Sequence, residues 1–260
     1  MMWQHFIWFA TAAVICWAIG AIIAYRSNRL SPVLIPFGLG SAIFMAFIIG
    51  LWISLERPPL RTMGETRLWY SFFLSVAGIM VYARWRYRWI LSFSTLLSAV
   101  FIGVNLLKPE IHSKTLMPAL QSAWFVPHVI VYMFSYALLG AATLFVIYLW
   151  LRPKQRIPTD EELGVCDNLV RIGWAFLTLG MIMGALWAKQ AWGDYWTWDP
   201  KETWAAATWL SYLLYLHLRR QQNDHRTAFA LIIISFILLQ MCWYGINFLP
   251  AAQGLSVHSY

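Results

Sequence analysis

Histidines are the residues of this sequence best suited to bind a metal. His128 begins one apolar run, His258 lies near the end of the chain, and His217 lies close to the far end of another apolar run. Neutral imidazole is a common axial ligand of haem iron, and an ionisable group near a membrane core is a functional candidate. A solvated or interfacial position is the competing interpretation for each. The remaining histidines are interpreted as surface residues: His5, His112 and His225.

Aromatic residues are concentrated in one connection between apolar runs. Trp192, Tyr195, Trp196, Trp198 and Trp204 fall within thirteen residues. An aromatic belt at the membrane surface would explain scattered tryptophans. It explains less well three tryptophans within seven residues beside Gly193, where the backbone can approach a partner closely. Such a platform suits a large, flat ligand that stacks.

The end of this aromatic loop also carries a helix-start signal. Asp199 can cap a following helix, Pro200 suits the first helical position, and Glu202 lies where a capping box requires it. These residues therefore have a structural explanation that needs no catalytic role.

Composition places the site in a membrane. Hydrophobic residues make up 60% of the 260 residues, charged residues 12%, and the mean hydropathy is +0.59. Soluble domains carry about 25% charged residues. We therefore predict an all-α, polytopic membrane protein that forms a single membrane domain over residues 1–260, with about eight transmembrane helices. The expected spans are 6–24, 33–53, 68–83, 89–107, 127–151, 169–187, 200–218 and 227–248.

Charge distribution predicts the orientation of these spans. The chain has a net charge of +8, and its Lys and Arg residues lie in short connections, more of them on one side of the eight-span arrangement. That side should be cytoplasmic, which explains the basic charge better than nucleic-acid binding does. His128, the aromatic loop at about 188–204 and His258 then share the non-cytoplasmic face. Two imidazoles beside a stacking platform are typical of a haem site.

Covalent catalysis is not indicated. The three cysteines lie far apart without CxxC spacing, and no Ser/His/Asp arrangement is evident, so we assign no catalytic residue. The cysteines are interpreted as packing residues: Cys16, Cys166 and Cys242. The apolar run 6–24 lacks a basic start and is interpreted as a retained helix. Any catalysis would arise from orienting reactants.

Several segments together resemble one family. The stretch WGDYWTWDPKETWA, Trp192 onward, resembles the WWD motif of haem-handling proteins, and its DPKETWA ending is similar to the CcsA/ResC branch of cytochrome c biogenesis rather than the CcmC or CcmF branches. The segments Met117–Trp124 with Pro127–Val129, and Gly254–Tyr260, resemble the family's two outer-histidine segments. YLHLR around His217 resembles its intramembrane histidine segment, and Pro58–Thr66 an outer loop. The likeness covers roughly residues 58–260.

The resemblance implies a function and a set of site residues. His128 and His258 would be the outer axial ligands of haem b, carried as a substrate, and His217 would contribute to an inner haem site. The residues that would cradle the outer haem are Trp192, Gly193, Tyr195, Trp196, Trp198 and Asp199. The chain would be one component of a cytochrome c synthase, delivering haem for attachment to CxxCH motifs. It would work with a separate ResB/CcsB-type membrane protein and apocytochrome c, with a thiol-reducing protein as a further candidate partner. Bacterial and plastid membranes both remain open, and the N-terminal residues, which are not typical of a transit peptide, favour a bacterial cytoplasmic membrane.

Three other interpretations remain open from the residues alone. A membrane b-haem electron-transfer subunit would use histidine pairs within spans, whereas the best pair here lies at the outer surface. A transporter of another cargo would show charged or broken helices at mid-membrane. A scaffold for a partner would leave the aromatic loop unexplained.

Overall fold

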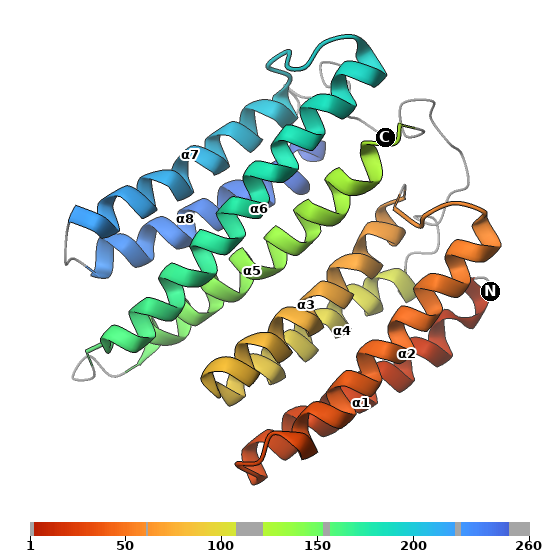
Figure 1. Ribbon diagram of the computed structural model, residues 1–260, viewed down its shortest axis with the longest axis vertical. Helices are drawn as coiled ribbons and strands as arrows, with labels where there is room; N and C mark the ends of the chain where they lie inside the picture. Colours follow the sequence, from red (N-terminus) through yellow and green to blue (C-terminus); the bar gives the residue numbers. More distant parts are fainter. Residues whose placement is uncertain (1–2, 61, 108–121, 153–156, 222–224, 250–260) are drawn as a thin grey trace. The chain divides into compact units, whose positions relative to one another are not determined.

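Helices account for the regular structure in the part of the chain that the structure describes (Figure 1). The computed structural model describes residues 3–60, 62–107, 122–152, 157–221 and 225–249. Within them lie eight α-helices and two short 3₁₀ helices: η1 (Trp3–His5), α1 (Phe6–Arg26), α2 (Ser31–Leu55), α3 (Met63–Trp85), α4 (Arg88–Leu107), α5 (Phe125–Leu151), α6 (Asp160–Trp192), α7 (Pro200–Gln221), α8 (His225–Trp243) and η4 (Gly245–Phe248). The predicted all-α class is confirmed.

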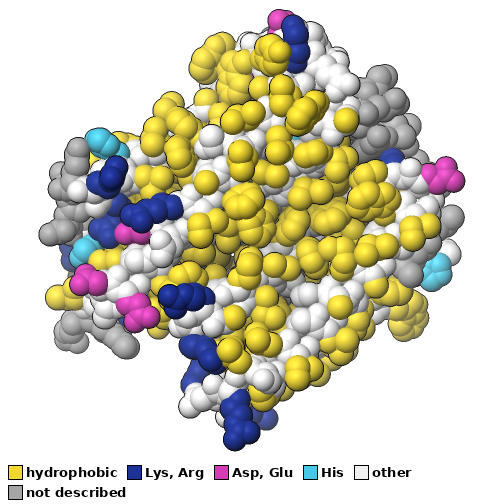
Figure 2. All heavy atoms as spheres, in the orientation of Figure 1, with side chains coloured by type: hydrophobic (Ala, Val, Ile, Leu, Met, Phe, Trp, Pro, Cys, Tyr) yellow, Lys and Arg dark blue, Asp and Glu magenta, His cyan; other side chains and the backbone are white. Residues whose placement is uncertain are grey.

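Six of these helical segments are long and apolar enough to cross a bilayer: η1 with α1, then α2, α4, α5, α6 and α8. The other two, α3 and α7, are not among them, and both carry acidic residues in the first turn and basic residues in the last turn. Large apolar side chains such as Ile35, Ile53 and Leu107 are exposed. Figure 2 shows apolar side chains along the helices, with Lys, Arg, Asp and Glu side chains near helix ends. This distribution suits a surrounding of lipid, and the chain is a multi-pass membrane protein.

Helix α6 differs most from its predicted span, 169–187. It runs through 33 residues, about 50 Å at 1.5 Å per residue, whereas a bilayer core is about 30 Å thick. The helix begins early because Thr159 and Glu162 form a capping box ahead of the apolar run. It ends at Gly193, whose positive φ of 96° is readily adopted by glycine.

The chain divides into two compact units, Met1–Leu116 and Met117–Tyr260. In the first unit α1 packs on α2, α2 on α3, α3 on α4, and α4 back on α1. The second unit repeats this pattern with α5, α6, α7 and α8. Each unit is therefore a closed ring of four helices (Figure 1). The single membrane domain expected over residues 1–260 stays a prediction.

Small polar side chains join the helices of the first unit. Trp17 of α1 donates its indole N–H to Ser41 Oγ of α2 at 3.1 Å, and Ser41 Oγ shares a hydrogen bond of 3.1 Å with Ser75 Oγ of α3. Ser98 of α4 donates to the Ser71 carbonyl of α3 at 2.9 Å. Short side chains let the helix backbones approach, and their hydroxyls satisfy one another within an apolar surrounding.

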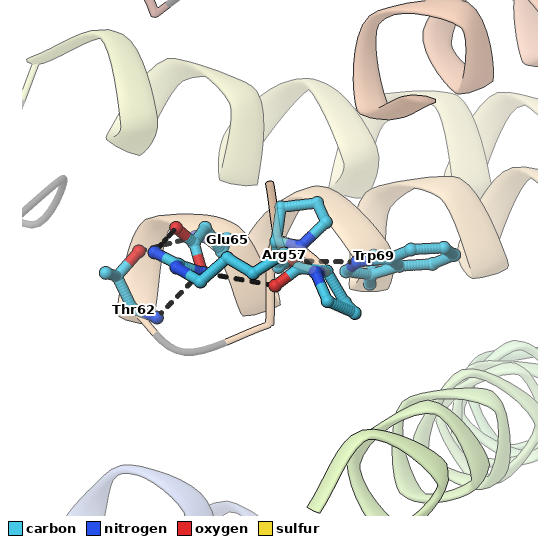
Figure 3. A network of polar contacts seen from close by, with 6 residues as sticks. Arg57, Thr62, Glu65 and Trp69 are labelled. Carbon is cyan, nitrogen blue, oxygen red and sulfur yellow. Dashed lines mark hydrogen bonds and ion pairs between the residues drawn. The ribbon is translucent and has the colours of Figure 1, made fainter. Parts of the chain in front are cut away.

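The α2–α3 turn is held by an ion pair between half-buried Arg57 and buried Glu65 (Figure 3). Arg57 donates to both carboxylate oxygens of Glu65, with distances of 3.0 and 2.8 Å. Glu65 also completes a capping box with Thr62, and the indole N–H of Trp69 donates to the Pro59 carbonyl at 2.9 Å. This turn lies in the segment whose sequence resembles an outer loop of the CcsA/ResC family, and its polar groups are used in shaping the turn.

Candidate functional site

His128 lies in the first turn of α5 and faces α6. Its Nδ1 is 2.8 Å from the carbonyl oxygen of Gly180, and its ring centroid is 4.5 Å from Tyr132 and 5.6 Å from Trp187. The interplanar angle with Trp187 is 30°, so the two rings are in tilted contact. The imidazole is half-buried. It is therefore a ring held in one orientation by a hydrogen bond and two aromatic neighbours.

Trp187 connects His128 with the aromatic loop. Its side chain is 2% exposed, and its ring meets the edge of Trp192 with centroids 4.8 Å apart. On its other side it contacts Phe125 at 5.1 Å. Sequence reasoning did not include Trp187 in the site. The available signal was its position five residues before Trp192, within the helix that leads into the loop.

The loop itself presents two aromatic side chains to the surroundings. Tyr195 is 55% exposed and Trp198 is 68% exposed, while Trp196 packs against Trp198 edge to face at 5.6 Å. Lys189 donates to the Gly193 carbonyl at 2.6 Å, and its ammonium lies 5.3 Å from the centre of the Tyr195 ring. The loop is thus tied to the end of α6 while its aromatic faces stay open.

The far end of the loop is fixed by the start of α7. Glu202 N–H donates to Asp199 Oδ1 at 2.8 Å, and Glu202 Oε2 accepts from the backbone N–H groups of Asp199 at 3.3 Å and Thr197 at 2.7 Å. The capping box predicted from the sequence is confirmed. Asp199 is 7% exposed and serves this cap, and Gly193 serves as the C-cap of α6. The haem contacts expected of Asp199 and Gly193 therefore stay predictions beside a structural explanation.

One hydrogen-bond donor of the loop has no acceptor among the described residues. The indole Nε1 of Trp196 is buried and has no hydrogen-bond partner among the described residues. A buried N–H without an acceptor costs about 1–3 kcal/mol, so such a group is a natural place for a ligand's oxygen.

Aromatic contacts continue from His128 toward the end of α8. Tyr132 stacks on Tyr136 at 5.5 Å, and Tyr136 contacts Trp243 at 5.7 Å. The start of α5 is also tied to the end of α6, because Ser122 Oγ donates to Gln190 Oε1 at 2.6 Å. The start of α5 and the ends of α6 and α8 thus form one aromatic cluster within the second unit.

Two parts of the predicted site lie outside the described residues. They are His258, in the segment 250–260, and residues 117–121 of the first outer-histidine segment. The pairing of His128 with His258 therefore stays a prediction.

His217 lies on α7 near the opposite end of the second unit and is exposed. Its neighbours on the helix bind α6: Tyr215 donates to Asp167 Oδ1 at 2.6 Å, and Arg219 donates to Asp167 Oδ2 at 3.0 Å. A residue two positions away points about 200° round a helix, so His217 faces away from Asp167. His128 and His217 therefore lie near opposite ends of the second unit, and the inner haem site stays a prediction.

These features define a class, a multi-pass helical membrane protein with a histidine and an aromatic loop at one end of a four-helix unit. Residues 5–252 match the family model described as cytochrome C assembly protein. The chain is 31% identical over 261 residues to the cytochrome c biogenesis protein CcsA of Pelargonium hortorum, which covers 82% of this chain and 81% of the relative. It is 32% identical over 268 residues to CcsA of Phalaenopsis aphrodite subsp. formosana, with 82% of each covered. The chain belongs to the CcsA family of cytochrome c assembly proteins.

Proposed function

We propose that this chain binds haem b as a substrate and presents it for covalent attachment to apocytochrome c, with His128 as one axial ligand. The observation that carries the proposal is the continuous contact from His128 through buried Trp187 to Trp192 of the aromatic loop. An imidazole suited to iron and a platform suited to a flat macrocycle thereby belong to one cluster. We place this site on the non-cytoplasmic face of the membrane, opposite the side whose connections hold more Lys and Arg residues.

The loop residues fit haem chemically. Exposed faces of Tyr195 and Trp198 can stack on a porphyrin, and Trp196 Nε1–H is a buried donor without an acceptor among the described residues. A haem propionate is an acceptor of the required kind, and a charged oxygen makes the stronger hydrogen bond. The site thus offers a metal ligand, stacking surfaces and a hydrogen-bond donor for a propionate carboxylate.

The role of these residues is to hold and orient. In the proposed reaction, each thiol of a CxxCH motif adds across one haem vinyl group, so that sulfur bonds to carbon and the thiol hydrogen ends on the other carbon. The incoming histidine then replaces an imidazole of this chain on the iron. Holding the reactants in that geometry is the contribution expected of a site without a nucleophile.

Other members of the proposed site act around this core. His258 supplies the second outer ligand, and His217 contributes to an inner site through which haem passes earlier. A ResB/CcsB-type membrane protein is the proposed working partner, with a thiol-reducing protein as a further candidate that keeps the apocytochrome cysteines reduced.

The test is an absorption spectrum of the chain purified after co-expression with its ResB/CcsB-type partner. His128→Ala should lower the retained haem and weaken the low-spin spectrum, because one axial ligand is removed. His225→Ala is the matched control, since His225 begins α8 at the end far from Trp243 and should leave the spectrum unchanged. A wild-type chain that purifies without haem, or an unchanged spectrum in His128→Ala, would remove the basis of the proposal.

A further inference from the structure

Helices α5 and α6 meet in two equivalent layers, each centred on a glycine of α6. In one layer His128 Nδ1 bonds the Gly180 carbonyl at 2.8 Å, and in the other Ser135 Oγ donates to the Gly173 carbonyl at 2.7 Å. The two donors are seven residues apart on α5, and the two glycines are seven apart on α6. The orientation of His128 is therefore set by the same antiparallel register that packs the rest of the helix pair.

Each layer also seats a large side chain on its glycine. A Cβ at Gly180 would collide with the ring of Tyr132, and one at Gly173 would lie 2.7 Å from Leu139 Cδ2. Tyr132 and Leu139 each lie four residues after the donor of their layer. Both positions therefore require glycine, and the two layers differ in whether the hydrogen-bond donor is a histidine or a serine.

Gly184 of α6 lies directly against the His128 ring, and the Ser135 layer has no corresponding glycine contact among the described residues. A Cβ at this position would lie 2.7 Å from Cε1 and 2.8 Å from Nδ1 of the imidazole. Contacts under 3 Å between such atoms essentially never occur, so any side chain at Gly184 would displace the ring. Because the clash includes Nδ1 itself, a displaced ring would have its hydrogen bond to the Gly180 carbonyl disturbed.

The partner of Nδ1 determines where the imidazole proton lies. A backbone carbonyl can only accept, so Nδ1 must carry the hydrogen, and the lone pair of the neutral ring is on Nε2. Metal-binding histidines characteristically donate their second ring N–H to a carbonyl or carboxylate, which fixes the tautomer and strengthens the ligand.

We infer that Gly180 and Gly184 are positioning residues that hold His128 as the Nδ1–H tautomer, with Nε2 presented as the ligand atom. This inference deepens the proposed function and depends on it for its meaning, but the tautomer is a property of the chain itself. Gly180 supplies the acceptor and room for Tyr132, and Gly184 supplies room for the imidazole. Gly173 supplies the equivalent acceptor for Ser135 and room for Leu139, in a layer that contains no histidine.

The experiment compares Gly184→Ala with Gly173→Ala in the full chain. The first measurement is ¹⁵N NMR of haem-free protein carrying ¹⁵N-labelled histidine, with the His128 signals assigned by their loss in His128→Ala. Wild type and Gly173→Ala should show a protonated Nδ1 and an unprotonated Nε2. Gly184→Ala should lose this pattern and show exchange between tautomers. The second measurement is the haem spectrum, where Gly184→Ala should lower haem affinity about 10-fold, as expected when an outer partner of a metal ligand is disturbed.

The two measurements separate the inference from the proposed function. An unchanged His128 pattern in Gly184→Ala, or the same change in Gly173→Ala, would overturn the positioning role. A wild-type chain without haem whose Nδ1–H pattern is lost only in Gly184→Ala would keep the positioning role and remove the haem function. Loss of both pattern and haem in Gly184→Ala alone supports both.

Discussion

Trp198 has an exposed side chain and a strained backbone conformation. Its φ of 59° lies in the left-handed region, which bulky residues rarely adopt, and its side chain is 68% exposed. Such a conformation costs about 1–3 kcal/mol and persists only when the surroundings enforce it. Here the loop is fixed by Gly193 on one side and the Asp199 cap on the other. The strained residue is thus also the more exposed of the two open aromatic side chains of the loop.

Trp198→Gly should therefore change stability and binding in opposite directions. Glycine adopts positive φ without penalty, so the free energy of unfolding should rise by about 1 kcal/mol, while haem retention should fall because the ring is gone. Trp198→Ala is the matched control, since it removes the ring but keeps the strain. Thermal unfolding in detergent and the haem absorption would be measured on both. A glycine variant less stable than the alanine variant would show that the backbone is not strained.

At the scale of elements, Glu202 stabilises both the start of α7 and the aromatic loop before it. Glu202 lies in the first turn of α7, yet its Oε2 accepts from two backbone N–H groups of the loop. Glu202 is 8% exposed, so water would replace its carboxylate poorly as an acceptor. The cap that begins the helix is thus also the group that shapes the preceding residues of the loop.

Glu202→Ala should destabilise the chain by about 1–2 kcal/mol, since it deletes one side of a capping box and leaves buried N–H groups without an acceptor. Glu202→Gln keeps an acceptor oxygen and should lose much less. Proteolysis by chymotrypsin at the loop aromatics, compared with the unfolding midpoint, would measure the effect. Equal cleavage in the alanine and glutamine variants would contradict a shaping role for the side chain.

Local patterns in the sequence predict elements well and contacts between elements poorly. Apolar runs locate the eight α-helices of the described residues, and the residue types at Asp199, Pro200 and Glu202 are sufficient to predict the start of α7. The first turns of α6 are polar and precede its apolar run, so the predicted span begins later than the helix does. The contact of His128 with Trp187 depends on the register between two helices, which no single segment encodes. The spacing of Gly173, Gly180 and Gly184 along one helix face was a usable signal of close packing.

At the scale of the whole molecule, each ring of four helices contains its own buried core and its own polar links between helices. The described candidate-site residues all belong to the second unit, where His128, Trp187 and the aromatic loop lie. The first unit has equally specific packing of its own: a Cβ at Gly78 of α3 would collide with Ser94 of α4. We therefore expect a packing defect to lower the stability of the unit that contains it before it affects the other unit.

The three free cysteines allow this expectation to be measured, because Cys16 lies in the first unit and Cys166 and Cys242 lie in the second. Gly78→Ala should overpack α3 against α4 by about 1–3 kcal/mol and so speed maleimide labelling of Cys16 in mild urea by about 5- to 150-fold. Gly173→Ala should instead speed labelling of Cys166 and Cys242. Ser94→Gly should restore Gly78→Ala toward wild type, since it removes the atoms that the new Cβ meets. Mass spectrometry of labelled peptides identifies each thiol, and a common acceleration of all three in either variant would mean that the two units unfold as one.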